Sequence, residues 1–235
     1  MKQMLFVFAF VAMAGPPPPP IAAQVDVGYP PPRSPFTDLE FKHEATLFGG
    51  YLASGKDPAG VAPRGGPLAG VRYEVVVGGP AQLVVRLAQA MTDRDVIDPT
   101  APLATRNLGT RSWPVYLADA GISLNLTGQR SFRRIVPVIY GGIGIASDLG
   151  KNVDVDPYRL GTTFAVSAAG GLRFVTGGRV QIRADVGTYL YQIKYPTAYY
   201  VQASDNTAVL DDSQARSFWK SNPAFTLGVS YLLFR

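Results

Sequence analysis

The residues VQIRADVGTYLY, numbers 180 to 191, decide the fold class. Apolar and polar side chains alternate along them with a period of two, which is the pattern of a β-strand with one apolar face. The apolar parity consists of Val180, Ile182, Ala184, Val186 and Leu190, and the opposite parity consists of Gln181, Arg183, Asp185, Gly187, Tyr189 and Tyr191. The stretch therefore predicts a strand that lies between an apolar and a polar environment.

The same alternation recurs in seven further stretches, so the sequence predicts eight strands. The other seven are residues 41–53, 71–77, 83–87, 116–126, 135–146, 164–174 and 225–233. Tight turns are expected at 78–80, 127–130 and 175–179, and long polar loops at 55–67, 91–112, 147–161 and 194–223. Short and long connections alternate, so an antiparallel up-and-down sheet places all short turns at one end and all long loops at the other.

The composition excludes several classes of protein. The 235 residues are 47% hydrophobic and 17% charged, and they include 25 glycines, 20 prolines, one histidine and no cysteine. The absence of cysteine excludes a disulfide scaffold, a thiolate zinc site and a cysteine nucleophile. No apolar run reaches the roughly 18 residues that a membrane-spanning helix needs. The composition predicts one β-rich domain.

The N-terminal segment has the layout of a secretory signal peptide. Lys2 is followed by an apolar run from Leu5 to Ala14, and small residues precede Gln24. The run is too short for a membrane anchor, so a signal peptide is expected over 1–23. A proline-rich spacer is expected over 24–37, and the strand region covers 38–235.

A closed eight-stranded sheet can be a membrane barrel or a soluble barrel of the lipocalin type, with opposite polarity inside and outside. The polar face here combines small residues with a few charged ones, which suits a narrow, filled interior. Aromatic residues gather toward the strand ends, as in the girdles of membrane barrels. These aromatics are Phe41, Tyr51, Trp113, Tyr116, Phe164, Phe174, Phe225 and Tyr231. The sequence thus predicts an all-β fold, an eight-stranded antiparallel up-and-down transmembrane β-barrel, with a soluble binder of apolar ligands as the alternative.

Two short stretches carry a family resemblance. The ending LGVSYLLFR, residues 227–235, resembles the final strand of bacterial outer-membrane barrels, although Arg235 follows the aromatic Phe234. The run YGGIG, residues 140–144, is similar to the glycine-rich fifth strand of the OmpA-like outer-membrane β-barrel superfamily. The resemblance covers 38–235. It implies a place in the outer membrane, contact with outer-membrane lipid, and insertion by machinery that reads the final strand.

The polar parity of the strands collects charges that are expected to face the barrel interior. They are Lys42, Glu44, Arg72, Glu74, Arg86, Asp119, Arg173, Arg183 and Asp185. Unpaired charges are costly in a lumen of low dielectric constant, so five bases and four acids predict a network of ion pairs. The network can act as a structural plug, and the alternative is a narrow gated pore for ions or small solutes.

Enzymatic chemistry finds little support in the sequence. His43 is the only candidate base for a serine nucleophile, and it is expected near the end with the short turns, on the wrong side for lipid chemistry at the outer face. Asp148, Asp154 and Asp156 follow no calcium-binding spacing. We therefore expect no enzyme, no cofactor, no metal and no nucleic-acid partner. The arginines at 130, 133 and 134 cluster at one short turn, where they are expected to meet lipid phosphates or to stay hydrated.

The longest loop is rich in aromatic residues, which predict a surface for interaction. These residues are Tyr195, Tyr199, Tyr200, Phe218 and Trp219. The same side chains can instead extend the barrel wall above the membrane. The sequence as a whole predicts a monomeric, non-enzymatic outer-membrane barrel with a structural or surface-interaction role.

Overall fold

The computed structural model describes residues 34–150 and 155–234. The chain divides into a unit that ends at Ser34 and a compact unit that begins at Pro35, and every strand of the described residues belongs to the second. The predicted signal peptide and nearly all of the predicted spacer lie outside the described residues, as do Asn152 and Asp154. The last part of the predicted spacer belongs to the compact unit.

The described residues form ten β-strands and one short 3-10 helix. The strands are β1 (Phe36–Asp38), β2 (His43–Leu52), β3 (Gly66–Gly78), β4 (Ala81–Ile97), β5 (Asn107–Asn125), β6 (Arg130–Phe132), β7 (Ile135–Ser147), β8 (Thr162–Val175), β9 (Val180–Lys194) and β10 (Ser217–Phe234). The helix, η2, covers Thr197–Tyr200. The eight predicted strands correspond to the eight long ones.

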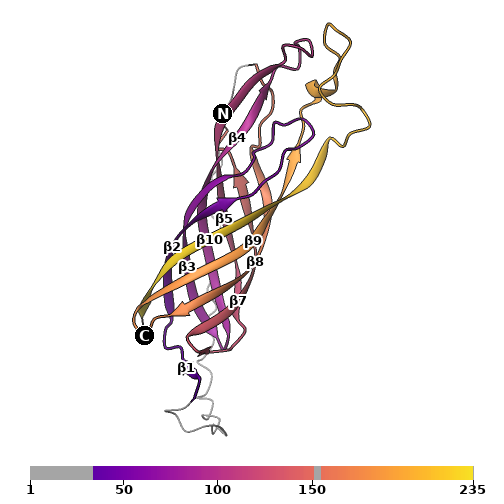
Figure 1. Ribbon diagram of the computed structural model, residues 1–235. Helices are drawn as coiled ribbons and strands as arrows, with labels where there is room; N and C mark the ends of the chain where they lie inside the picture. Colours follow the sequence, from indigo (N-terminus) through magenta and orange to yellow (C-terminus); the bar gives the residue numbers. More distant parts are fainter. Residues whose placement is uncertain (1–33, 151–154, 235) are drawn as a thin grey trace, which may run out of the picture. The chain divides into compact units, whose positions relative to one another are not determined.

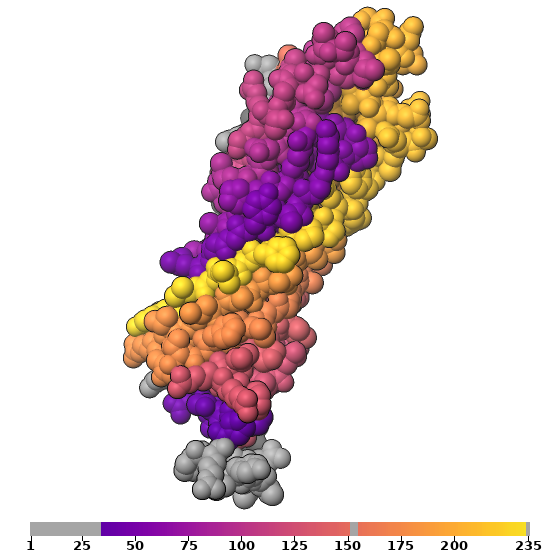
Figure 2. All heavy atoms as spheres, viewed as in Figure 1, coloured from indigo at the N-terminus to yellow at the C-terminus, as the bar shows by residue number. Residues whose placement is uncertain are grey.

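The eight long strands close into a ring (Figure 1). The order is β7-β5-β4-β3-β2-β10-β9-β8, and β8 pairs back with β7. Every pairing is antiparallel, and β10 closes the ring against β2. Figure 2 shows β10 in yellow on the outer surface, between indigo β2 and orange β9. A closed ring has no free strand edges, and the predicted fold class is confirmed.

Two hairpins extend further than the sequence analysis predicted. β4 continues to Ile97 and β5 already begins at Asn107, within the predicted loop 91–112. β10 likewise begins at Ser217, inside the predicted loop 194–223. The prediction was wrong here because Thr92 and Arg94, both buried, continue the inward parity of β4 with polar side chains. Alternation of apolar and polar residues therefore ends before the strand does.

A second correction concerns the short connection after β5. The sequence predicted a simple turn at 127–130, but the segment contains β6, which pairs with β1 in register. Phe36 lies opposite Phe132, and Asp38 lies opposite Arg130. We call this two-stranded element the β1–β6 ribbon.

The outward face of the ring is apolar and exposed. Large exposed apolar side chains include Leu47, Val71, Leu83, Val85, Leu87, Ile122, Ile139, Ile143, Val186, Leu227 and Val229. The inward face holds buried charges. This polarity is the reverse of a soluble barrel, so it corrects the soluble alternative and makes the barrel a transmembrane one. No helix in the described ranges is long and apolar enough to cross a membrane.

Two aromatic residues expected in the outer girdles lie inside the barrel instead. Trp113 is 6% exposed and Phe41 is 8% exposed. Trp113 has the opposite parity from Tyr116 on β5, so the two side chains point to opposite faces. Phe41 precedes β2, where strand parity does not apply.

Candidate functional site: the filled lumen of the barrel

Eight buried or nearly buried charges meet in the half of the lumen nearer the short turns. Four are arginines and four are carboxylates: Arg72, Arg86, Arg173, Arg183, Glu44, Glu74, Asp119 and Asp185. We call this set the lumen cluster. Its formal charges sum to zero, as a low-dielectric interior requires. Lys42, the ninth predicted member, is exposed and lies before β2 begins, so it is not part of the set.

Strand register by itself places like charges opposite one another. Glu44 faces Glu74 across β2 and β3, and Arg173 faces Arg183 across β8 and β9. Directly opposed like charges destabilise a sheet. Glu74 and Arg183 each have a partner of opposite charge on their own strand, whereas Glu44 and Arg173 pair with each other across the lumen. The pair across the lumen can form only when the barrel is closed.

Glu74 is the centre of the lumen cluster. Its carboxylate oxygens accept hydrogen bonds from Nε of Arg72 at 2.6 Å and from Nη2 of Arg173 at 2.6 Å. Nη1 of Arg183 lies 3.1 Å from both oxygens. Arg173 comes from β8 and Arg183 from β9, so these two contacts cross the lumen from the β3 wall. Arg173 also pairs with Glu44 at 3.2 Å.

A second group of contacts surrounds Asp119. Nε of Arg86 donates to Oδ1 at 3.0 Å, and the hydroxyl of Tyr140 donates to the same oxygen. The guanidinium carbon of Arg86 lies 4.1 Å from the centroid of the Tyr140 ring and 5.2 Å from that of Tyr189. The arginine is thus paired at its edge and stacked at its face, which fits a guanidinium held out of water.

The free space among the side chains of the lumen cluster is small. A cavity of about 20 Å³ lies among Thr46, Arg72, Arg86, Arg183 and Tyr189. That volume holds about one water molecule. The lumen cluster therefore fills the interior at this level.

The lumen ends in an apolar side chain at the end with the short turns. Phe41 enters this mouth, and the guanidinium carbon of Arg173 lies 5.2 Å from the centroid of its ring. The chain around it is held by the Leu39 N–H, which donates to Gln129 O at 2.8 Å, and by Lys42 O, which accepts from Val76 N–H at 2.9 Å. The segment before β2 is thus tied to the barrel on both sides of Phe41.

At the opposite end, the long loops fold into the barrel mouth. Side chains from the first, third and fourth loops are buried there in one apolar cluster with the wall: Val61, Tyr158, Tyr199 and Leu210, with Leu117 of β5. We call the inserted loop residues, together with the buried ion pair of Arg94 and Asp156, the loop plug.

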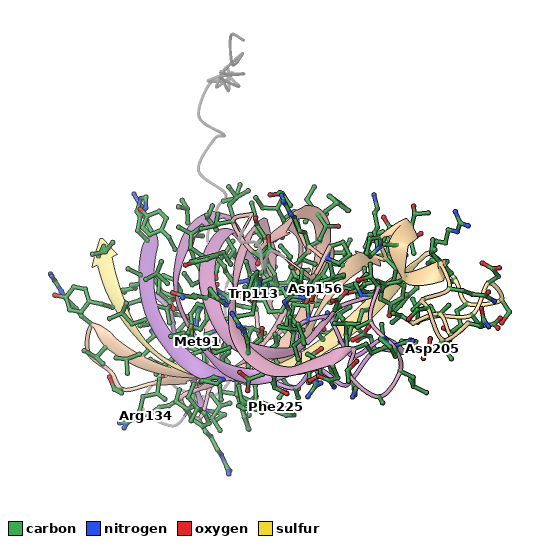
Figure 3. The ribbon with its side chains drawn as sticks, turned by 90° about the horizontal axis from the view of Figure 1, so that it is seen from above. Met91, Trp113, Arg134, Asp156, Asp205 and Phe225 are labelled. Carbon is green, nitrogen blue, oxygen red and sulfur yellow. The ribbon has the colours of Figure 1, made fainter. Side chains whose placement is uncertain are left out.

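The ion pair of the loop plug is surrounded by aromatic and polar partners. Nη1 of Arg94 lies 2.9 Å from Oδ2 of Asp156, and the guanidinium carbon lies 4.3 Å from the centroid of the Trp113 ring. Asp156 also accepts from the Tyr199 hydroxyl at 2.7 Å and from the Tyr158 N–H at 2.9 Å. Figure 3 labels Trp113 and Asp156 among the crowded side chains of this region.

A second carboxylate holds the first loop to the fourth. Asp57 accepts from the Ala62 N–H at 2.9 Å and from the Tyr195 hydroxyl at 2.6 Å. Burial and the hydrogen bond to Asp57 raise the pKa of Tyr195 well above its usual value, and burial and the bond to Asp156 do the same for the pKa of Tyr199. Both phenols are therefore neutral donors at physiological pH.

These contacts correct the predicted interaction surface. Tyr195 and Tyr199 are buried in the loop plug and are not available to a partner. Tyr200 is partly buried, and Phe218 packs with its ring centroid 5.8 Å from that of Tyr195. Trp219 alone of the five is widely exposed, on the outer wall, edge-on to Phe164.

The residues considered for catalysis or metal binding have other neighbours. Nδ1 of His43 lies 2.7 Å from the Tyr73 hydroxyl, at the end with the short turns. Asp156 belongs to the loop plug, and Asp148 accepts the Leu160 N–H at 3.0 Å. Within the described ranges, no group of three or more histidines or carboxylates could hold a metal ion.

Sequence reasoning missed several residues of the interior. Tyr140 was hidden because the stretch 135–146 is apolar on both faces, and only its parity with the inward Val136 and Val138 marks it. Arg94 and Trp113 fell in a predicted loop or at its edge. Asp57 and Tyr158 lie on loops, where no periodicity applies, so no local signal identifies them.

Comparisons with known proteins concern the fold. A scan against protein-family models found no match, and a search of the curated proteins found none either. Among solved structures, the outer membrane protein OprG from Pseudomonas aeruginosa is similar at a TM-score of 0.51 and 9% identity, over 84% of this chain and 99% of that one.

Two other solved structures are similar at lower scores. Neisserial surface protein A matches at a TM-score of 0.47 and 11% identity, over 85% of this chain and 98% of that one. The Yersinia pestis outer membrane protein Ail matches at a TM-score of 0.41 and 15% identity, over 82% of this chain and 99% of that one. Such identities bear on fold alone. The closed ring of strands and the likeness to OprG confirm the predicted eight-stranded antiparallel barrel fold.

Proposed function

We propose that this protein is a closed, non-enzymatic barrel of the outer membrane that anchors its long loops as a rigid structure on the cell surface. The observation that supports the proposal is that side chains occupy the interior at three levels, although a pocket of about 360 Å³ opens beside Phe41 at the mouth with the short turns. Phe41 lies in one mouth, the lumen cluster fills the middle, and the loop plug occupies the other mouth. Filled interiors are the expected state of barrels with eight strands.

The lumen cluster supports a plug rather than a pore. Its charges are balanced, and its ion pairs lie at distances of up to 3.6 Å. Removing one partner of a buried pair costs about 3–5 kcal/mol. An ion that passed would have to separate several such pairs at once, and the loop plug would still lie in its path.

Hydrogen bonds connect the long loops to one another, which does not favour a binding function that requires the loops to rearrange. Their tyrosines donate to buried carboxylates, and the Arg106 Nη1 of the second loop donates to the Ala208 carbonyl of the fourth at 2.7 Å. Cross-bracing of this kind suits a rigid surface that is presented rather than a lid that closes.

Outer-membrane lipid and the insertion machinery are the partners we propose. The exposed apolar wall supports the first. For the second, β10 closes the ring and carries outward apolar side chains at Val229, Tyr231 and Leu233, which the machinery would read. The filled lumen is complete within one chain, which supports a monomer.

Conductance in planar bilayers tests the plug against a pore. We expect the refolded protein to insert, to shift its gel mobility on boiling, and to produce no ion steps above the bilayer background. Steady steps that change with Glu74→Gln or Arg183→Gln would establish the pore instead. A protein that stays folded and soluble without detergent would overturn the membrane barrel itself.

A further inference from the structure

The hairpin turn between β6 and β7 has unusual chemistry. Phe132 pairs with Ile135, so Arg133 and Arg134 are the two central residues of a two-residue turn. Their φ angles are 47° and 68°, both in the left-handed region. Such turns favour Asn-Gly, because glycine has no Cβ and the short polar side chain of asparagine tolerates the left-handed region better than other side chains do. Two consecutive arginines are therefore placed where backbone preference opposes them.

The backbone of this turn is held on both sides. The Arg133 N–H donates to Pro35 O at 2.8 Å, and the Arg134 carbonyl accepts from the Val175 N–H at 2.8 Å. The polar groups of the turn thus bind the segment before β1 and the end of β8. Both side chains are exposed. These hydrogen bonds hold the backbone from which the two exposed arginine side chains extend (Arg134 is labelled in Figure 3).

The β1–β6 ribbon beside the turn has two different faces. Ser131 is fully buried against the barrel, and its hydroxyl donates to Thr37 O at 3.3 Å. On the other face, Phe36 and Phe132 are 45% and 43% exposed, with ring centroids 5.4 Å apart. The guanidinium carbon of Arg133 lies 5.5 Å from the Phe132 centroid. The exposed face therefore combines two aromatic rings with cationic groups.

The two ends of the barrel differ in charge. Outside the lumen cluster, the described residues at the end with the short turns include five exposed bases and two exposed acids: Lys42, Arg130, Arg133, Arg134, Arg179, Asp38 and Glu40. The long-loop end, over its described residues, carries nine of each sign: Lys56, Arg64, Arg94, Arg106, Arg111, Arg159, Lys194, Arg216, Lys220, Asp57, Asp93, Asp95, Asp98, Asp148, Asp156, Asp205, Asp211 and Asp212. Among the described residues, a positive surplus is thus found at the end that bears the ribbon and not at the end with the long loops.

We propose that the β1–β6 ribbon and its Arg133-Arg134 turn bind the phosphate headgroup of an anionic phospholipid. This inference rests on the proposed membrane barrel, because the ribbon then lies at the level of a leaflet's headgroups. Guanidinium groups match phosphate oxygens in a bidentate geometry. The rings of Phe36 and Phe132 would then lie at the same level, where membrane barrels carry girdles of aromatic residues. The net charge of the end selects anionic over zwitterionic lipid.

The turn offers a substitution that removes the charges and retains the fold. Arg133→Asn with Arg134→Gly introduces the dipeptide that this turn prefers. Arg111→Gln with Arg159→Gln is the matched control, because it removes two exposed arginines from the opposite end of the barrel. Both double variants lower the net charge by two.

The experiment is native mass spectrometry of the folded protein released from micelles that contain equal amounts of phosphatidylglycerol and phosphatidylcholine with the same acyl chains. We expect the unaltered protein to retain phosphatidylglycerol at least fivefold over phosphatidylcholine. The Asn-Gly variant should lose that preference, and the control variant should keep it. Heat-dependent gel mobility verifies that each variant is folded.

Two results would overturn the proposal. One is an equal preference for phosphatidylglycerol in the Asn-Gly variant and the unaltered protein. The other is an equal loss in both double variants, which would show that only total charge matters. If the protein conducted ions and still preferred phosphatidylglycerol, the proposed plug would be wrong and the proposed lipid site would be supported. The two proposals can therefore be tested independently.

Discussion

Glu74 lies between three arginine side chains, and two of them belong to strands on other sides of the lumen. Arg72 comes from its own strand, Arg173 from β8 and Arg183 from β9. The carboxylate of Glu74 therefore compensates the positive charges of Arg173 and Arg183, which lie opposite each other in the sheet. Glu44 helps through Arg173, and Asp185 helps through Arg183 at 2.7 Å.

Glu74→Gln should destabilise the barrel strongly. The amide keeps the shape but leaves the lumen with one uncompensated positive charge, and breaking a buried ion pair costs about 3–5 kcal/mol. Urea unfolding in detergent micelles, followed by tryptophan fluorescence, measures the loss. Glu40→Gln, at an exposed acid, should change the free energy of unfolding by under about 0.5 kcal/mol. Equal effects of the two variants would show that the lumen pairs contribute no net stability.

Gly142 and Gly141 are adjacent glycines on β7 with opposite surroundings. A Cβ at Gly142 would lie 2.1 Å from the Tyr140 hydroxyl oxygen, whereas a Cβ at Gly141 would meet no atom within 4 Å. The inward glycine therefore makes room for the tyrosine that donates to Asp119.

Gly142→Ala should displace Tyr140 from Asp119 and cost about 1–3 kcal/mol, through overpacking and a lost hydrogen bond. Gly141→Ala points outward into open space and should leave the free energy of unfolding within about 0.5 kcal/mol of the unaltered protein. The midpoint of urea unfolding in micelles distinguishes them. If Gly141→Ala proved the more damaging change, the assigned inside and outside of β7 would be reversed.

At the scale of elements, three of the four long loops, the first, third and fourth, contribute side chains to the buried core. They place apolar and tyrosine side chains into the mouth and attach them through Asp57 and Asp156. Loops at a surface usually have higher mobility than the strands they connect. Here the buried phenols tie the first, third and fourth loops to the barrel.

The loop plug should open at alkaline pH. The pKa values of Tyr195 and Tyr199 are raised in the folded protein, so their stabilising contribution is complete below the unfolded phenol pKa of about 10 and is lost as the pH rises above it. Ultraviolet absorbance of phenolate should show these tyrosines ionising only as the plug opens. Tyr199→Phe should remove one phenol from that late phase. Ionisation of all tyrosines in a single step near pH 10 would contradict a buried plug.

The alternation of apolar and polar residues predicted the ring of eight strands, but it did not predict which side chains pair or pack inside the ring. Period two identifies eight strands, and the alternation of short and long connections gives the order, because both are local properties of the chain. The extensions of β4 and β5 were missed because Thr92 and Arg94 are polar on the inward face. The pairing of Glu74 with Arg173 depends on closure of the ring, and the burial of Tyr195 and Tyr199 depends on loop conformation, so neither leaves a periodic signal.

For the whole molecule, the distribution of side chains defines a body with a polar interior and an apolar wall. The chain has two tryptophans, one on the outer wall and one in the interior of the barrel, so their fluorescence can distinguish the two environments. Trp219 is 53% exposed on the wall, and Trp113 is 6% exposed inside.

Quenching by lipids with brominated acyl chains should separate the two tryptophans. A Trp113→Phe variant retains only Trp219, and its fluorescence should fall several-fold in brominated vesicles. A Trp219→Phe variant retains Trp113, which the wall shields, and should change little. Strong quenching of Trp113 would place that side chain in lipid and contradict the inward parity of β5.

The zero net charge of the lumen cluster is a property of the completed ring. Its members come from β2, β3, β4, β5, β8 and β9, and the contacts of Glu74 with Arg173 and Arg183 join strands that are not neighbours. A sheet that met hydrocarbon before closing would expose Arg173 without a partner and would leave Arg183 with Asp185 alone. An arginine that faces lipid costs about 2–4 kcal/mol near the bilayer midplane. We therefore expect the unfinished sheet to stay hydrated or sheltered until its first and last strands meet.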